Sequence, residues 1–359
     1  YKFFNFKIIR KIRIFFVLFF KCKFFFKDPK QSEFVILDSA NTLFVEKIFP
    51  NKNYTIISTR IGQINEIYLS KKIIIYIIKN FFKYSVKKNY LTALILMVAP
   101  KVVITHIHDS VEFHFIAKIL EGKIKFMAIQ VCSPSMFEWI FSEKDKKNFF
   151  IPNFFCYGEY DKLFYKKKNV NIKYYETIGS IKSSLAYEYT KSKNIKINPN
   201  KYDVCLISEA FPSPIGDWDH VRNLADSFGL VANFTHRLCK KHNLSLVFVG
   251  LVNKDAKYPE LENHFYKHYL KDYDFKIIQS HKDDENEYTY TSYTNIMQSK
   301  LTIALFSTML REAIAFDKKF LSFNTVSHPD IEFPGPDIPF PQESICVLKE
   351  PSYELFEER

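Results

Sequence analysis

The sequence predicts an α/β protein of two tandem Rossmann-like, doubly wound domains with a cleft between them. Short runs rich in Ile, Val and Phe alternate with helical patterns, and such alternation forms parallel sheets with right-handed crossovers. A length of 359 residues fits two domains. The charge changes sign midway: residues 1–200 hold 34 basic and 15 acidic side chains, and residues 201–359 hold 17 and 24.

Residues 1–30 form a basic, aromatic segment ahead of the first domain. Residues 1–27 carry eight basic and no acidic side chains. The longest apolar run, Ile14 to Phe20, is shorter than the roughly 20 residues of a membrane span. The segment could lie on an anionic membrane surface, or pack on the first domain as a helix or strand.

The expected location is cytoplasmic. No cleavage site of a secretory signal follows the apolar run, and the six cysteines include no C-x-x-C pair. A peripheral position on the inner face of the cell membrane is a hypothesis that rests on the basic segment.

The first domain is expected at residues 31–185. Its expected strands are Phe34–Asp38, Tyr54–Thr59, Lys101–Ile107, Lys125–Val131 and Phe149–Tyr157. Helical patterns between them include Asn65–Tyr84, Tyr90–Val98, Val111–Leu120 and Met136–Lys146. Pro100 stands where a helix must stop before the next strand.

A polar stretch at residues 186–201 is the expected linker, and the second domain is expected at residues 202–359. Strand Asp203–Ser208 is followed by the long helix Asp219–His242, whose acidic start and basic end complement the helix dipole. The remaining expected strands are Leu244–Gly250, Phe275–Gln279, Leu301–Phe306 and Phe320–Phe323. The remaining expected helices are Pro259–Leu270, Ser292–Ser299 and Thr308–Phe316.

The strongest local motif lies where strand Leu301–Phe306 ends. Ser307 and Thr308 follow the strand and open a helix, and hydroxyls beside free backbone N–H groups can bind an anion. Glu312 lies one turn further on and could reach a ribose or sugar hydroxyl. The alternative is a Ser/Thr N-cap with a favourable first-turn Glu.

This region resembles the donor-nucleotide half of bacterial surface-carbohydrate transferases with GT-B architecture. That group includes capsule and O-antigen glycosyltransferases, Kdo transferases, polysialyltransferases and CDP-glycerol glycerophosphotransferases. The capsule and O-antigen subgroup shows Tyr, a short helix, Ser, an apolar strand, then Ser-Thr and Glu-Ala. This chain supplies, in that order, Tyr293, Ser299, Ser307, Thr308, Glu312 and Ala313.

The resemblance extends into the first half of the chain. The segment PKVVITHIHDSVEFHFIAK is similar to the subgroup's strand–Asp–helix element, with Asp109 at the acidic position, and FMAIQ ends at Gln130 as its next strand does. Gly179 and Ser180 match a Gly-Ser element. The chain departs at residues 131–134, where Val-Cys-Ser-Pro replaces the usual Asn-Gly turn.

The resemblance implies transfer of a sugar or polyol phosphate from a CMP- or CDP-type donor to a polysaccharide or lipid-linked acceptor. Donor contacts would come from the second-domain motif residues with Gly179 and Ser180, and Gln130 would lie on the acceptor side. Asp109 is the first choice as the base that deprotonates the acceptor, followed by His108 and His106. No cofactor or metal need be invoked.

Two other functions stay open from the sequence. His106, His108 and Asp109 resemble strand-end metal ligands of hydrolases, although the full H-x-H-x-D-H spacing is absent. A catalytically degenerate scaffold that binds a nucleotide or partner is the other alternative, because residues 131–134 depart from the family pattern. Nucleic acid is not an expected partner, because the lysines are scattered and no finger spacing or RNA-binding signature occurs.

Overall fold

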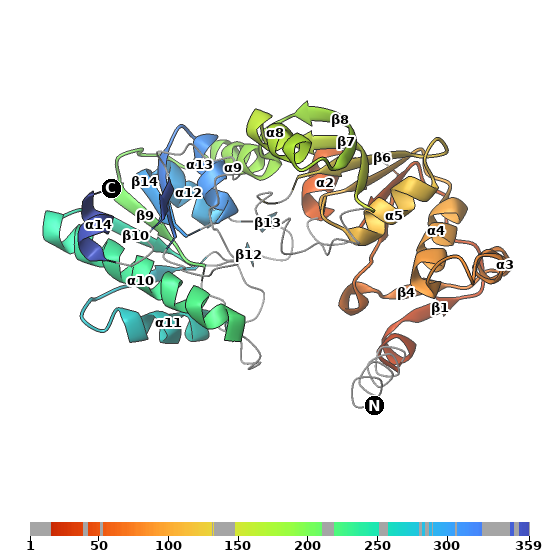
Figure 1. Cartoon of the computed structure of the whole chain (residues 1–359), viewed down its shortest axis with the longest axis horizontal. Helices are drawn as coiled ribbons and strands as arrows, with labels where there is room; N and C mark the ends of the chain where they lie inside the picture. The colour runs from red at the N-terminus through yellow and green to blue at the C-terminus, as the bar shows by residue number, and fades with distance from the viewer. Residues whose placement is uncertain are drawn as a thin grey trace. The chain divides into compact units, whose positions relative to one another are not determined.

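The computed structural model divides the chain into two compact units, Tyr1–Val131 with Met136–Ile178, and Cys132–Ser135 with Gly179–Arg359 (Figure 1). It describes residues 16–38, 42–50, 53–130, 132, 148–209, 219–250, 258–279, 282–283, 287–288, 290–305, 307–324, 345–347 and 352–358. Each unit contains a six-stranded parallel sheet. The two sheets confirm the predicted fold class, and the cleft stays a prediction.

The sheet of the first unit has the strand order β3-β2-β5-β6-β7-β8. Its strands are β2 (Phe34–Leu37), β3 (Tyr54–Ile57), β5 (Val102–Thr105), β6 (Lys125–Ile129), β7 (Phe150–Cys156) and β8 (Asn171–Thr177). A separate parallel pair joins β1 (Lys23–Phe25) to β4 (Glu66–Tyr68). The core of this unit combines aliphatic side chains with aromatic rings, among them the fully buried Phe113, Phe126 and Tyr165.

Three helices of the first unit, α3 (Lys71–Lys79), α4 (Val86–Val98) and α5 (Val111–Ile119), begin at serine caps. Its other helices include α2 (Thr42–Ile48) and α8 (Glu159–Lys167), with a short 3-10 helix η1 (Ile61–Gln63). Ser70, Ser85 and Ser110 each accept a hydrogen bond from the backbone N–H three residues on. These contacts satisfy backbone donors that a helix start leaves open, and so fix where α3, α4 and α5 begin.

The first unit differs from the sequence expectation in three places. The expected helix Asn65–Tyr84 divides into β4 and α3, because residues 66–68 pair with β1 and Ser70 starts a new helix. The expected strand Lys101–Ile107 ends at Thr105. Strand β8 was not predicted, since its sequence is mostly polar, and the expected helix Met136–Lys146 lies outside the described residues.

The sheet of the second unit has the strand order β11-β10-β9-β14-β15-β16. Its strands are β9 (Tyr202–Ile207), β10 (Leu246–Val249), β11 (Ile277–Ile278), β14 (Ser299–Ala304), β15 (Lys319–Asn324) and β16 (Ile345–Val347). Its helices include α9 (Ile181–Ser192), α10 (Asp219–His242), α11 (Tyr258–Tyr269), α12 (Thr291–Met297), α13 (Thr308–Ile314) and α14 (Tyr353–Glu358). A small antiparallel pair joins β12 (Lys282–Asp283) to β13 (Glu287–Tyr288).

The expected linker at residues 186–201 is helical as far as Ser192, where α9 ends. The chain passes between the units at Ile178–Gly179, so α9 belongs to the second unit. Ala186 on α9 is fully buried, and the Tyr189 ring lies 5.3 Å from the Tyr290 ring. The polar composition of this stretch therefore reflects the outer face of a surface helix.

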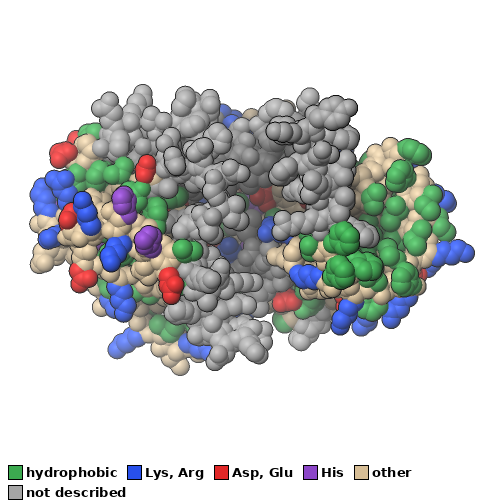
Figure 2. Space-filling model, turned by 90° about the horizontal axis from the view of Figure 1, so that it is seen from below, with side chains coloured by type: hydrophobic (Ala, Val, Ile, Leu, Met, Phe, Trp, Pro, Cys, Tyr) green, Lys and Arg blue, Asp and Glu red, His purple; other side chains and the backbone are tan. Residues whose placement is uncertain are grey.

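Exposed apolar side chains gather at one end of the first unit. Figure 2 shows hydrophobic side chains over the end that carries β1, β4 and α3 in Figure 1, with Lys and Arg side chains beside them. Among the most exposed are Phe20, Phe26, Ile78 and Phe82. No helix of the described residues is long and apolar enough to cross a membrane.

Candidate functional site

The strand order of the second unit places a switch point between β9 and β14. In open parallel sheets, ligands bind beyond the carboxyl ends of the strands at the point where the strand order reverses. Glu209, which follows β9, accepts the backbone N–H of Leu305, which follows β14, on its Oε2 atom. Glu209 is only 5% exposed, so its carboxylate holds the ends of the two strands together.

Glu312 lies at the centre of the predicted donor-side residues. Its Oε1 accepts a hydrogen bond from the Ser180 hydroxyl at 2.7 Å, and its Oε2 accepts one from the Tyr293 hydroxyl at 2.8 Å. The three side chains are between 2% and 8% exposed. Glu312 therefore ties α13 to α12 and to the start of α9. This arrangement favours a positioning role over the expected contact with a ribose or sugar hydroxyl.

Ser307 and Thr308 lie half-buried at the carboxyl end of β14. The Ser307 Oγ accepts the backbone N–H of Met309 at 3.3 Å, so the N-cap alternative is present in the structure. An N-cap hydroxyl can still donate its own proton to a ligand. These two residues are the donor-side motif residues that stand at the switch point.

Gly179 and Ser299 occupy different environments. Gly179 has a φ of +75°, a left-handed conformation that suits glycine, and it leads directly into Ser180. Ser299 is the first residue of β14 and is fully buried, with its hydroxyl donating to the Asn295 carbonyl at 2.7 Å. Since β14 is six residues long, Ser299 lies roughly 16 Å from the carboxyl end. We therefore remove Ser299 from the donor site.

Sequence reasoning missed a second buried carboxylate near the end of β9. Glu262 on α11 is fully buried, accepts a hydrogen bond from the Ser208 hydroxyl, and accepts one from the Gln279 amide at 2.6 Å. The Ser208 hydroxyl also lies 3.1 Å from the Tyr266 hydroxyl. This network fixes the ends of β9 and β11, and the helical pattern of α11 alone gave no sign of it.

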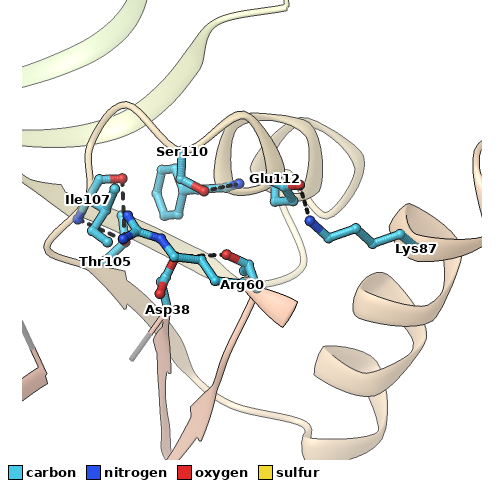
Figure 3. Close-up of polar contacts among 9 residues, drawn as sticks. Asp38, Arg60, Lys87, Thr105, Ile107, Ser110 and Glu112 are labelled. Carbon is cyan, nitrogen blue, oxygen red and sulfur yellow. Dashed lines mark hydrogen bonds and ion pairs between the residues drawn. The ribbon is translucent and has the colours of Figure 1, made fainter. Parts of the chain in front are cut away.

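The first unit has an equivalent switch point between β2 and β5, where sequence reasoning missed Asp38. Asp38 is 3% exposed, accepts a hydrogen bond from the Thr59 hydroxyl at 2.7 Å, and lies 3.4 Å from the Arg60 Nε atom. Figure 3 shows Asp38 and Thr105 at the ends of neighbouring strands, with the Arg60 side chain extending toward Asp38. An Asp directly after the run Phe-Val-Ile-Leu was the available signal.

Asp109 lies half-buried in the turn between β5 and α5. The N-cap of α5 is its neighbour Ser110, whose Oγ accepts the Phe113 N–H at 3.3 Å (Figure 3). Asp109 is thus not the N-cap of α5. A half-buried carboxylate at this edge is placed where it could accept a proton.

His106 and His108 are core residues, 3% and 2% exposed. His108 Nε2 lies 2.9 Å from the Tyr165 hydroxyl, and its ring stacks on Phe154 at 5.4 Å. Burial lowers the pKa of His108, because the charged ring would lose its hydration. The structure therefore assigns His108 a packing role. Strand β5 ends at Thr105, so His106, which was expected on strand Lys101–Ile107, lies in the turn that follows the strand.

Gln130 connects three elements of the first unit. Its Nε2 donates to Asp161 Oδ1 at 2.7 Å, and its Oε1 accepts the Tyr157 backbone N–H at 2.9 Å. Gln130 and Asp161 are 1% and 0% exposed. Because both ends of the amide are occupied in the core, Gln130 positions the loop after β7, and the expected acceptor contact finds no support.

No group of three or more His, Cys, Asp and Glu side chains within the described ranges is arranged to hold a metal ion. The metal-hydrolase alternative therefore gains no support from His106, His108 and Asp109. The contacts of His108 also differ from those of a ligand, since its Nε2 atom is already bonded to Tyr165.

Comparison with known proteins locates a family match in the second unit. Residues 217–341 match the model of a family described as "putative O-antigen biosynthesis protein". The range contains Tyr293, Ser307, Thr308 and Glu312. No curated protein matches the chain.

Several solved structures are similar to the chain over most of its length. A "putative UDP-N-acetylglucosamine 2-epimerase" from Listeria monocytogenes is 10% identical, with a TM-score of 0.51, over 91% of this chain and 86% of that chain. A glycosyltransferase from Rickettsia africae is 12% identical over 92% and 87%, with a TM-score of 0.42. The wall teichoic acid polymerase TagF is 10% identical over 92% and 81%, with a TM-score of 0.45.

At 10% identity, the epimerase match shows a shared fold and nothing more specific. The family match adds a biological setting, because its description is O-antigen biosynthesis. The two matches agree with the predicted Rossmann-like fold and with the resemblance of the second unit to proteins of O-antigen biosynthesis.

Proposed function

We propose that the protein transfers a sugar or a polyol phosphate from a CMP- or CDP-type donor to a polysaccharide or lipid-linked acceptor in capsule or O-antigen biosynthesis. The observation that carries the proposal is the convergence of Ser180, Tyr293 and Glu312 next to the switch point of the second unit. Two of these residues lie within the O-antigen family match.

The donor phosphates would lie against Ser307 and Thr308 at the carboxyl end of β14. Their hydroxyls can donate hydrogen bonds to phosphate oxygens and stabilise the charge that develops on the leaving nucleotide. Glu312, one turn further along α13, would hold this segment in place through Ser180 and Tyr293. Asp109 in the first unit is the proposed base for the acceptor hydroxyl.

Calorimetric titration with CMP, CDP and UDP tests the donor site. We expect binding of a cytidine nucleotide that Ser307→Ala and Thr308→Ala each weaken. Ser352→Ala is the matched control, because Ser352 Oγ accepts a backbone N–H at 3.3 Å at the start of another helix of the same unit. Binding that is unchanged in both variants, or no binding of any nucleotide, would contradict the donor-site proposal.

The proposed base has its own test. Asp109→Asn should abolish transfer and leave donor affinity unchanged, because the amide cannot accept the acceptor proton. Glu112→Gln is the control, because Glu112 is a nearby carboxylate that forms an ion pair with Lys87 and has no proposed role in transfer. Full activity of Asp109→Asn would refute the assignment.

A further inference from the structure

Helix α3 combines an apolar composition with a surface position. Between the lysines at its ends, residues 73–78 are Ile-Ile-Ile-Tyr-Ile-Ile. A helix that is apolar on all sides is normally buried. In α3 only Ile73 is buried, whereas Ile74, Ile75 and Ile78 are 41%, 40% and 67% exposed. Helix α3 thus presents an apolar face to the surroundings of the unit.

The turn after α3 extends this apolar surface. Phe81 and Phe82 are 54% and 98% exposed, and their ring centroids lie 5.4 Å apart in an edge-to-face arrangement. Two phenylalanine side chains this exposed to water do not gain the free energy that burial would provide. Large exposed apolar patches on a folded protein mark binding surfaces.

A second segment, distant in sequence, lies beside α3. The pairing of β1 with β4 brings residues 23–25 next to residues 66–68, and Lys72 at the start of α3 forms an ion pair of 2.7 Å with Asp28. Phe20 and Phe26 of this segment are 80% and 78% exposed. We call the exposed apolar side chains of residues 20–26 and 74–86 the α3 surface (Figure 2).

The charge around the α3 surface indicates what covers it. Residues 16–28 and 66–88 contain nine lysines and two acidic residues. A like-charged second copy of this surface would be repelled. A surface with phenylalanines and a surrounding excess of lysines instead matches an anionic bilayer, in which the rings enter the interface and the ammonium groups contact the phosphates.

We propose that the α3 surface docks the protein on anionic phospholipid, with Phe81 and Phe82 entering the interface. The membrane contact would then include the turn after α3 in the folded unit as well as the basic N-terminal segment. This inference is independent of the proposed transfer reaction, because a surface can bind lipid whatever the protein catalyses.

Flotation of the full-length protein with vesicles tests the proposal. We expect strong binding to vesicles rich in phosphatidylglycerol, weak binding to pure phosphatidylcholine, and loss of binding at high salt, which screens the lysines. Phe81→Ser with Phe82→Ser should weaken partitioning roughly a hundredfold or more, since burial of two phenylalanine side chains is lost. Lys79→Gln with Lys83→Gln should weaken it about thirtyfold, on anionic vesicles only.

Leu163→Ser is the matched control, because Leu163 is a 59% exposed apolar side chain on α8, and it should leave binding unchanged. Circular dichroism and nucleotide affinity establish that each variant is folded, and the lysine pair keeps the test available if the phenylalanine pair misfolds. Wild-type binding by both double variants overturns the proposal. Equal binding to neutral and anionic vesicles also overturns it. So does a double variant that self-associates less than the wild type in sedimentation but binds vesicles as strongly, because the α3 surface would then be an interface between copies of the chain.

Discussion

The hydrogen bonds to Glu312 predict an unusually large effect of a small substitution. Ser180→Ala removes one hydroxyl, and with it two contacts: the donor to Glu312 Oε1 at 2.7 Å and the acceptor for the Ser183 backbone N–H at 3.2 Å. Loss of a helix cap costs about 1 kcal/mol. A buried acceptor left without its donor costs about 1–3 kcal/mol more. Ser180→Ala should therefore cost about 2–4 kcal/mol in the free energy of unfolding.

Ser110 provides a matched control in the first unit. It is 8% exposed against 7% for Ser180, and its Oγ accepts the Phe113 backbone N–H at 3.3 Å as the cap of α5. Ser110→Ala should cost about 1 kcal/mol, since it removes a cap alone. The difference between the two substitutions then measures the bond to Glu312.

Urea unfolding, monitored by circular dichroism, measures these free energies. Each substitution should shift the urea midpoint of the unit that carries it and leave the dependence of the free energy on urea concentration unchanged. Tyr293→Phe should cost about 1–3 kcal/mol, because it removes only the donor to Glu312 Oε2. The double variant should depart from additivity, since both hydroxyls bind one carboxylate. The reasoning is refuted if Ser180→Ala costs no more than Ser110→Ala. It is also refuted if the free-energy costs of Ser180→Ala and Tyr293→Phe simply add in the double variant, as they would for independent sites.

Two further predictions concern stability. Burial lowers the pKa of His114 to about 3, so the unfolded chain binds the extra proton, and the native state should lose roughly 2 kcal/mol between neutral pH and pH 5. His114→Phe should flatten that part of the pH profile of unfolding, and an unchanged profile would contradict it. Gly229→Ala inside α10 should destabilise the protein although alanine favours helix, because the new Cβ would lie 2.3 Å from the Tyr269 ring. Gly62→Ala, which meets nothing within 4 Å, should be nearly neutral, and thermal unfolding of both checks the contrast.

The order of strands and helices was largely predictable because buried parallel strands are written locally in the sequence. Runs such as Phe-Val-Ile-Leu at β2 and Val-Val-Ile-Thr at β5 are apolar because helices cover both faces of a parallel sheet. β8 at the sheet edge escaped notice because its residues are mostly exposed and polar. The same reasoning misjudged α9, whose exposed polar face had the composition of a linker.

The candidate site was less predictable because a motif names residues and not their partners. Asp109 and Ser110 are adjacent in sequence, yet only the structure shows that Ser110 makes the cap contact. Gln130 and His108 carried chemical groups suited to a site, but their bonds to Asp161 and Tyr165 lie in the core. Those partners are 31 and 57 residues away, beyond the reach of any local pattern.

The contacts of Glu312 explain why short motifs far apart can occur together. Its two donors, Tyr293 and Ser180, lie 19 and 132 positions away in the sequence. The Gly-Ser, Tyr and Glu-Ala elements therefore belong to one hydrogen-bond network, and this network holds the start of α13 at Thr308 in place. Thr308, the first residue of α13, is one of the two proposed phosphate contacts. Ser180→Ala should therefore weaken the binding of a cytidine nucleotide although Ser180 makes no proposed contact with it. Ser180→Thr, which keeps the hydroxyl, should restore it, whereas nucleotide binding by Ser180→Ala as strong as that of the wild type would refute this positioning role of Glu312.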